Sequence, residues 1–182
     1  WLHNGFVNVD REKMSKSIGN VLLVNDLLGQ APGEAIRLAL LSAHYRQPLD
    51  WTDDGLAQAV RMLDRLYGAL RTLSDIDADG AVAPDADFLK ALNDDLNTPK
   101  ALAALFELAR QANIAGTAAD KSRIKGTLLA SAALMGLLAL DPEDWFAGAV
   151  DDGDGPDADE IKRLIQARKD ARTAKDFAEA DR

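Results

Sequence analysis

The sequence predicts a mainly α-helical fold, in which an antiparallel helical bundle follows a short β-hairpin. The composition favours helices, because Ala and Leu dominate the 47% of residues that are apolar and only 5% are aromatic. Apolar positions recur at helical spacing over long stretches, and short polar breaks separate these stretches. Several amphipathic helices with short connections are typical of an antiparallel bundle around one core.

The first predicted element is a hairpin over residues 5–14. Aromatic and β-branched residues at 6–9 favour a strand, and the pair at 10–11 favours a turn before the chain returns. A polar loop follows at residues 15–20.

From Val24 onward the apolar spacing becomes helical. Thr52 is placed to cap a helix, and the acidic residues after it oppose the helix dipole. Breaks at 75–87 and 115–120 divide the helical stretches. Helices are expected over 32–45, from Thr52, from Thr98 and from about Asp120.

The C-terminal part differs in composition. Residues 148–160 are rich in Gly and Asp, which is typical of a solvated linker, and the helical pattern after them is basic. We therefore expect four regions: the hairpin and polar loop within residues 1–30, a bundle over 31–147, the linker 148–160, and the start of a small module at 161–182.

Composition and length restrict the class of protein. The 182 residues begin at Trp1 and end inside a helical pattern, so we expect a piece of a longer polypeptide. The absence of cysteine excludes disulfides and thiolate metal sites within these residues. The longest apolar-rich run, 127–140, is too short to span a membrane. A net charge of −9 argues against a protein that coats nucleic acid, but not against a local contact. We expect a cytoplasmic monomer.

The stretch "VDREKMSKSIGN" places two lysines, Lys13 and Lys16, beside Ser15 and Ser17. Ammonium groups, hydroxyls and free backbone N–H groups together can bind a polyphosphate. A mobile lysine side chain can also move to stabilise negative charge that develops on the phosphate. Gly19 lets the backbone turn, and a loop can close over a nucleotide and then release it. On composition alone, a solvated loop with two ordinary lysines is the simpler interpretation.

The string K-M-S-K-S after a hairpin resembles the signature loop of class I aminoacyl-tRNA synthetases. The surrounding sequence narrows this resemblance to the cysteinyl-tRNA synthetase family, in the same order and spacing. The stretches that carry it are "WLHNGFVNVDREKMSKSIGN", "IRLALLSAHYRQPLDW", "LNDDLNTPKALAALFELAR" and "ARKDARTAKDFAEADR". The resemblance covers nearly the whole chain and is weakest at 75–87 and 115–158.

This resemblance implies that the loop binds ATP, with Mg²⁺, and stabilises the adenylation of cysteine to cysteinyl-AMP before transfer to tRNA(Cys). It implies that Lys16 contacts the ATP phosphates and that Lys13 acts beside it on the pyrophosphate side. Met14 would anchor the loop on apolar surface, and Ser15 and Ser17 would supply hydroxyl or backbone donors.

The resemblance also places a Rossmann-type catalytic domain, with its HIGH motif, before Trp1, together with the Cys, His and Glu ligands of a zinc ion. Zinc needs such ligands in close geometry. The two histidines, His3 and His44, are far apart in sequence. We therefore expect no metal site in this chain and no synthetase activity from it alone.

Two regions are candidates for tRNA contacts. Arg46 follows His44 and Tyr45 at a predicted helix end, where it either contacts the inner corner of the tRNA or caps the helix, and we prefer capping. The C-terminal helix resembles the first helix of the family's anticodon-binding module, and basic side chains there could neutralise phosphates. An exposed face that keeps the helix soluble explains these charges equally well. The candidates are Lys162, Arg163, Arg168, Lys169, Arg172 and Lys175.

Other conspicuous residues have structural interpretations. Asp94, Asp95 and Asn97 read as helix punctuation before Thr98, and Trp145 as a cover over one end of the bundle.

Two further functions compete with a cysteine–tRNA ligase. The cysteine ligase of mycothiol synthesis resembles the same region, but it lacks the basic C-terminal helix. A non-catalytic helical tRNA-binding module would explain the bundle but would leave the K-M-S-K-S loop unused.

Overall fold

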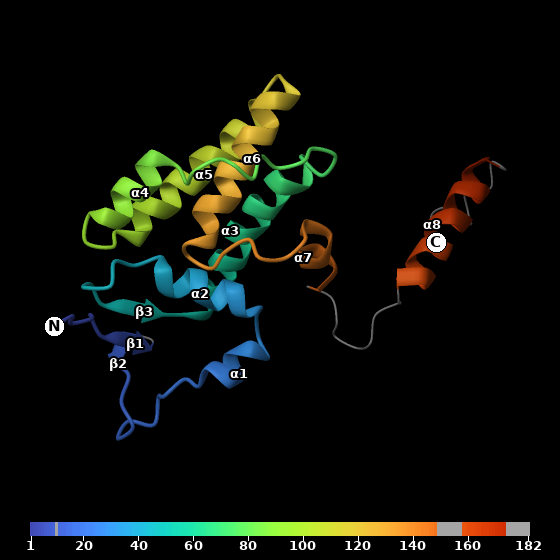
Figure 1. The fold of residues 1–182 in the computed structure, drawn as a ribbon. Helices are drawn as coiled ribbons and strands as arrows, with labels where there is room; N and C mark the ends of the chain where they lie inside the picture. The colour runs from blue at the N-terminus through green and yellow to red at the C-terminus, as the bar shows by residue number, and fades with distance from the viewer. Residues whose placement is uncertain (10, 149–157, 174–182) are drawn as a thin grey trace. The chain divides into compact units, whose positions relative to one another are not determined.

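The computed structural model describes residues 1–9, 11–148 and 158–173, and the chain forms two compact units, residues 1–146 and 147–182. The first unit combines a small sheet with a set of packed helices, which confirms the predicted fold class (Figure 1). The strands are β1 (Val7–Val9), β2 (Glu12–Lys13) and β3 (Leu49–Trp51). The helices are α1 (Val24–Leu28), α2 (Gly33–Leu41), α3 (Asp53–Arg71), α4 (Ala86–Asn93), α5 (Thr98–Ile114), α6 (Ala118–Ala133), α7 (Pro142–Gly148) and α8 (Ala158–Thr173).

The sheet has the strand order β2-β1-β3. β1 and β2 form the predicted antiparallel hairpin, with Asn8 opposite Lys13. β3 lies parallel to β1 on its other side, with Val9 opposite Trp51. The sequence did not predict this third strand. Figure 1 shows the sheet beside α2, with the loop after β2 extending away from the helices.

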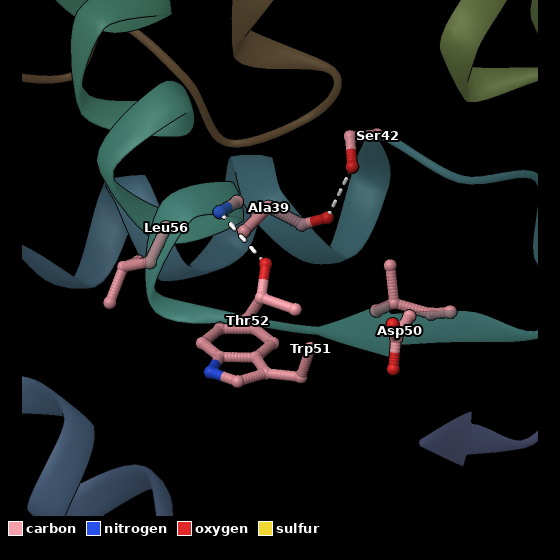
Figure 2. A pocket seen from close by; sticks show the side chains of 8 residues that line it. Ala39, Ser42, Asp50, Trp51, Thr52 and Leu56 are labelled. Atoms are coloured by element: carbon pink, nitrogen blue, oxygen red, sulfur yellow. Dashed lines mark hydrogen bonds between the residues drawn. The ribbon is translucent and has the colours of Figure 1, made fainter. Parts of the chain in front are cut away.

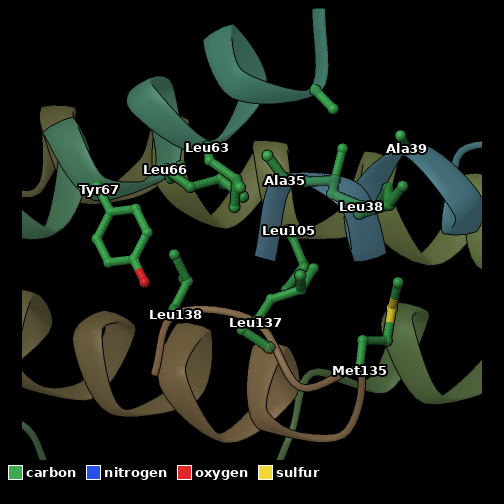
Figure 3. Close-up of a cluster of buried hydrophobic side chains, with 14 of the residues drawn as sticks. Ala35, Leu38, Ala39, Leu63, Leu66, Tyr67, Leu105, Met135, Leu137 and Leu138 are labelled. Carbon is green, nitrogen blue, oxygen red and sulfur yellow. The ribbon is translucent and has the colours of Figure 1, made fainter. Parts of the chain in front are cut away.

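The helices of the bundle pack in a sequence of pairs. α3 packs against α2 and α5, and α5 also packs against α4 and α6. Leu38, Leu63 and Leu105, from three of these helices, are fully buried in the shared core (Figure 3). Within each of these helices the buried residues recur at helical spacing and lie on one face. This is why the apolar periodicity predicted a bundle.

Side-chain caps define where several helices start. The Thr52 hydroxyl accepts a hydrogen bond from Gly55 N at 3.0 Å, as predicted, and α3 begins at the next residue. Asn97 caps α5 through Lys100 N at 3.2 Å, so the polar residues before Thr98 do separate two helices. These caps satisfy backbone N–H groups that have no partner within the helix.

The predicted helix over residues 32–45 is shorter than expected. α2 ends at Leu41, where the Ser42 hydroxyl donates a hydrogen bond to Ala39 O at 2.6 Å. The chain then turns toward β3, so His44 to Arg46 do not cap the helix, and the capping interpretation is wrong. Helix α4 was not assigned from the sequence, and α6 begins slightly earlier than expected, at Ala118.

Trp145 of α7 is buried against α3, and its predicted place over one end of the bundle stays a prediction. It is 4% exposed, and its ring stacks on Tyr67 with the centroids 4.7 Å apart. Its indole N–H donates to Asp64 at 2.9 Å, so the polar edge of the ring is also satisfied.

The second unit contains α8, which confirms a helix after the predicted linker for residues 158–173. Residues 149–157 of that linker, and Lys175, lie outside the described residues. In the part of the chain that the structure describes, no helix has the length and apolar character needed to cross a membrane.

Candidate functional site

The K-M-S-K-S residues lie at the end of the hairpin, where β2 leaves the sheet. Lys13 is the last residue of β2, and Met14 N still donates to Val7 O at 3.0 Å. Arg11 turns the chain with a φ of 69°. The hairpin therefore fixes the first two residues of the motif, Ser15 is half-buried, and Lys16 and Ser17 lie in the exposed turn that follows.

Hydrogen bonds inside the loop fold it on itself. The Ser15 and Ser17 hydroxyls lie 3.2 Å apart, and Gly19 N donates to Ser15 O at 3.2 Å. Gly19 has a φ of 77°, which a residue with a Cβ rarely adopts. The serines thus shape the loop from within, and the loop needs glycine at this turn.

Asn20 closes the loop, and sequence reasoning missed this residue. Its side-chain oxygen accepts from Ser15 N at 2.8 Å, and its amide nitrogen donates to Lys13 O at 3.4 Å. One side chain therefore ties the end of the loop back to Lys13 and Ser15 of the motif. The only sequence signal for this role was a polar residue directly after Gly19. The hydrogen bonds that Asn20 forms could not be predicted, because they depend on how the loop folds.

The two lysines have different surroundings. The Lys13 ammonium nitrogen lies 3.7 Å from the centroid of the Phe6 ring. Lys16 is exposed, and its side chain has no hydrogen bond or ion pair among the described residues. The loop thus presents one cation resting on an aromatic face and one that is free to reach an anion.

The hairpin is bound on its other side to the segment before α3. Gly5 N donates to Tyr45 O at 2.7 Å, and Leu49 N donates to Phe6 O at 2.9 Å. A Cβ at Gly5 would lie 2.1 Å from Gln47 O, so only glycine allows the two backbones to approach this closely. Arg11 N also donates to Asp50 at 2.8 Å. These bonds hold the loop on the same unit as the bundle.

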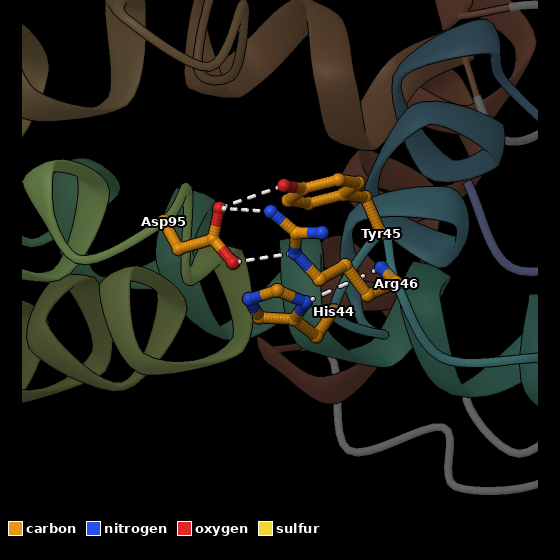
Figure 4. Close-up of polar contacts among 4 residues, drawn as sticks. All are labelled: His44, Tyr45, Arg46 and Asp95. Atoms are coloured by element: carbon orange, nitrogen blue, oxygen red, sulfur yellow. Dashed lines mark hydrogen bonds and ion pairs between the residues drawn. The ribbon is translucent and has the colours of Figure 1, made fainter. Parts of the chain in front are cut away.

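Arg46, a candidate for tRNA contact, is paired with Asp95 of the turn between α4 and α5 (Figure 4). Its guanidinium donates to both carboxylate oxygens, at 2.6 and 3.1 Å, and the Tyr45 hydroxyl adds a third bond at 2.7 Å. The bonds from Arg46, and then that from Tyr45, lower the pKa of Asp95 from 3.8 to about 2. Asp95 therefore joins the segment before β3 to the bundle.

The cavity next to β3 is small. A cavity of about 40 Å³ lies behind β3 and is lined by Trp51, Thr52 and Leu56, among others (Figure 2). It has room for water but not for a nucleotide. Among the described residues, no three side chains of His, Cys, Asp or Glu are grouped closely enough to hold a metal ion, and the chain has no cysteine. The side chains described here therefore do not fit a zinc ion.

The basic candidates of the C-terminal region lie on α8, apart from Lys175. Arg163, Arg168, Lys169 and Arg172 are exposed, and Arg163 forms an ion pair with Glu160 one turn earlier. Basic side chains on an exposed helix are available to a polyanion, although pairing with acids weakens their effect.

Comparisons with known proteins identify the relatives of this chain. Residues 1–61 match the family model of the class I (C) tRNA synthetase catalytic domain, and residues 87–139 match that of the DALR domain. The cysteine–tRNA ligase of Parvibaculum lavamentivorans is 64% identical over 184 residues. Those of Paramagnetospirillum magneticum and Rhodospirillum rubrum are 58% and 53% identical. The chain is similar to these cysteine–tRNA ligases along its whole length.

The chain covers only part of these ligases. All of it is matched, yet it spans 39%, 40% and 39% of the length of the three relatives. The catalytic-domain match includes the sheet and the K-M-S-K-S loop and ends within α3. The DALR match covers α5 and α6 and most of α4.

Proposed function

We propose that this chain supplies the K-M-S-K-S loop and the helical bundle of a cysteine–tRNA ligase. The observation that carries the proposal is an internally hydrogen-bonded loop with Lys16 unpaired among the described residues, in a chain 64% identical to such a ligase. In this proposal residues 1–30 complete the catalytic domain and residues 31–147 form the bundle. Residues 148–160 are a linker from the bundle to residues 161–182, which begin an anticodon-binding module.

The proposed reaction has two steps. A carboxylate oxygen of cysteine attacks the α-phosphorus of ATP, and the bond to the pyrophosphate oxygen breaks to give cysteinyl-AMP. A terminal ribose hydroxyl of tRNA(Cys) then attacks the cysteinyl carbonyl, loses its proton and releases AMP. Negative charge grows on the leaving pyrophosphate in the first step, which is where a mobile cation lowers the barrier most.

We assign the residues of the loop to this first step. Lys16, on the exposed turn, contacts the phosphates, and Lys13 supports the pyrophosphate side. Ser17 donates from its hydroxyl or backbone N–H, and Ser15 from its hydroxyl, because Asn20 already accepts from the Ser15 backbone N–H. Half-buried Met14 anchors the loop. The Mg²⁺ of ATP enters with the substrate. Any zinc of the ligase would be held by residues outside the chain described here.

For tRNA we propose phosphate contacts from Arg46 and from basic side chains of the C-terminal region. The candidates remain Arg46, Lys162, Arg163, Arg168, Lys169, Arg172 and Lys175. Arg46 would reach RNA only by sharing or leaving Asp95, so its role is secondary. We propose a monomer that works in the cytoplasm.

The test is charging of total tRNA with radiolabelled cysteine. It uses an intact ligase in which this chain is continued to the length of its relatives, called the intact ligase below. We expect label on tRNA only when ATP is present. Formation of cysteinyl-AMP without transfer to tRNA would point instead to a ligase that joins cysteine to a small amine. No cysteine-dependent use of ATP would leave a non-catalytic tRNA-binding module.

A further inference from the structure

We propose that Phe6 is a positioning residue for Lys13. The face of its ring holds the Lys13 ammonium group at the start of the K-M-S-K-S loop, in place to meet the phosphates of ATP. This inference rests on the proposed function, and it adds a residue that lies outside the motif.

The geometry of the hairpin brings the two side chains together. Asn8 lies opposite Lys13, so Phe6, two residues before Asn8, shares its face of the sheet and is the diagonal neighbour of Lys13. The ammonium nitrogen lies 3.7 Å from the ring centroid, well within the range of a cation–π interaction. Register and side-chain contact thus agree.

The backbone on which the ring stands is firmly held. Leu49 N donates to Phe6 O at 2.9 Å, and the preceding residue, Gly5, is bonded to Tyr45 and pressed against Gln47. Tyr45 in turn donates to Asp95 of the bundle. The ring therefore has a fixed base, whereas Lys13 on the short strand β2 has a long, flexible side chain.

The exposure of Phe6 argues against a role in the core. The residue is 58% exposed, and it does not belong to either cluster of buried apolar side chains. Burial within the described part of the chain therefore accounts for little of its presence at this position. A ring that restricts the lysine side chain reduces the conformational entropy that Lys13 would lose when it binds phosphate.

This arrangement divides the work between the two lysines. Lys13 is held before the nucleotide arrives, and Lys16, without a partner among the described residues, is free to move with the turn. A preorganised cation favours binding of ATP, while a mobile one can follow the charge that develops during the reaction.

The contact is tested first by NMR on the 182-residue chain. Ring currents of Phe6 should shift the methylene protons next to the Lys13 ammonium upfield. Phe6→Leu should abolish this shift, Phe6→Trp should keep it, and the corresponding signals of Lys16 should not change. Equal Lys13 shifts in the unaltered chain and in Phe6→Leu would overturn the contact.

The role is tested by cysteine-dependent exchange of pyrophosphate into ATP in the intact ligase. Phe6→Leu should raise the KM for ATP about two- to five-fold, the size of an exposed cation–π contact, with little change in kcat. Phe6→Tyr should restore the KM. In a Lys13→Ala background, Phe6→Leu should have no further effect, because the cation it holds is gone.

An equal effect of Phe6→Leu with and without Lys13 would show a merely structural side chain and overturn the proposal. If the intact ligase shows no cysteine-dependent exchange at all, the proposed function fails and the role toward ATP fails with it. The NMR contact between Phe6 and Lys13 would still stand in that case, so the two failures are distinguishable.

Discussion

Asp95 shows how much a single residue can connect. Its backbone and that of Leu96 both have a φ of 53°, an uncommon conformation for residues with a Cβ. The carboxylate accepts bonds from Tyr45 and Arg46, which precede β3, and β3 pairs with the hairpin that leads to Lys13. Helix punctuation was predicted correctly for this turn, but its partners depend on the fold and not on the local sequence.

The pKa of Asp95 gives a prediction at the residue scale. Because the folded carboxyl has a pKa of about 2 against 3.8 ordinarily, its contribution to stability is complete above pH 3.8 and is lost as the pH falls through about 2. We expect a midpoint near 2 when the Asp95 carboxyl carbon is titrated by NMR. Arg46→Gln, which removes the largest cause, should move the midpoint back toward 3.8. An unchanged midpoint in Arg46→Gln would contradict the pairing.

Among single residues, the sequence identified the residues of the K-M-S-K-S motif but not the neighbouring residues that hold the motif in place. Lys13 to Ser17 could be picked out because their spacing in the motif is local. Asn20 and Phe6 could not, since their roles come from bonds and contacts that only the closed hairpin creates. The exposed loop itself carries the lysines, whereas neighbouring elements determine where it lies.

At the scale of elements, Glu34 of α2 holds the segment after α6 in place through hydrogen bonds. It accepts from Leu138 N at 2.6 Å and from the Tyr67 hydroxyl at 2.8 Å. The Tyr67 hydroxyl also accepts from Leu140 N at 3.2 Å, and burial raises the pKa of Tyr67 well above its usual value. Leu138 has a φ of 59°, an unfavourable backbone conformation for leucine, so the chain after α6 needs the hydrogen bond to Glu34 to hold this conformation.

Glu34→Ala should therefore lower the free energy of unfolding. Loss of the acceptor leaves a partly buried N–H and hydroxyl unpaired, which costs about 1–3 kcal/mol. Urea denaturation of the chain, followed by circular dichroism, measures the change. The matched control is Glu34→Gln, which keeps an acceptor oxygen and should lose less. An equal loss in both variants would show that charge, and not the acceptor, matters here.

The elements that the sequence failed to predict share a physical cause. β3 has three residues and is held by parallel pairing with β1, so no local periodicity reveals it. α2 ends at Leu41, earlier than predicted. The segment after it leads to β3, and the bond from the Tyr45 hydroxyl to Asp95 holds that segment in a non-helical course. The starts of α3 and α5 were predicted, since Thr52 and the residues before Thr98 act on their own neighbours.

At the scale of the whole first unit, the larger cluster of buried apolar side chains joins the helices of the bundle and supports the sheet beside it. Trp51 of β3 belongs to the same buried cluster as Leu63 and Leu105. The fold class was predictable because this core follows from the periodicity of the helices. The position of the loop relative to the bundle was not, because a few long-range backbone bonds set it.

Truncation of the core should be costly, and truncation of the surface should not. Leu105 is 0% exposed and Leu134 is 56% exposed. We expect Leu105→Ala to lower the free energy of unfolding by about 2–5 kcal/mol, through lost burial and the cavity that remains. Leu134→Ala should change it by less than about 0.5 kcal/mol. Chemical denaturation of both variants measures this, and similar losses would contradict the assigned core.

The central claim is that the K-M-S-K-S loop acts on the phosphates of ATP. Cysteine-dependent pyrophosphate exchange by the intact ligase with Lys16→Ala tests it most directly, with Lys90→Ala on α4 as the matched control. We predict a fall in rate of about 100- to 1,000-fold for Lys16→Ala, as expected for lost stabilisation of charge in the transition state, and an unchanged rate for Lys90→Ala. An unchanged exchange rate in Lys16→Ala, in a ligase that remains folded, would contradict the account.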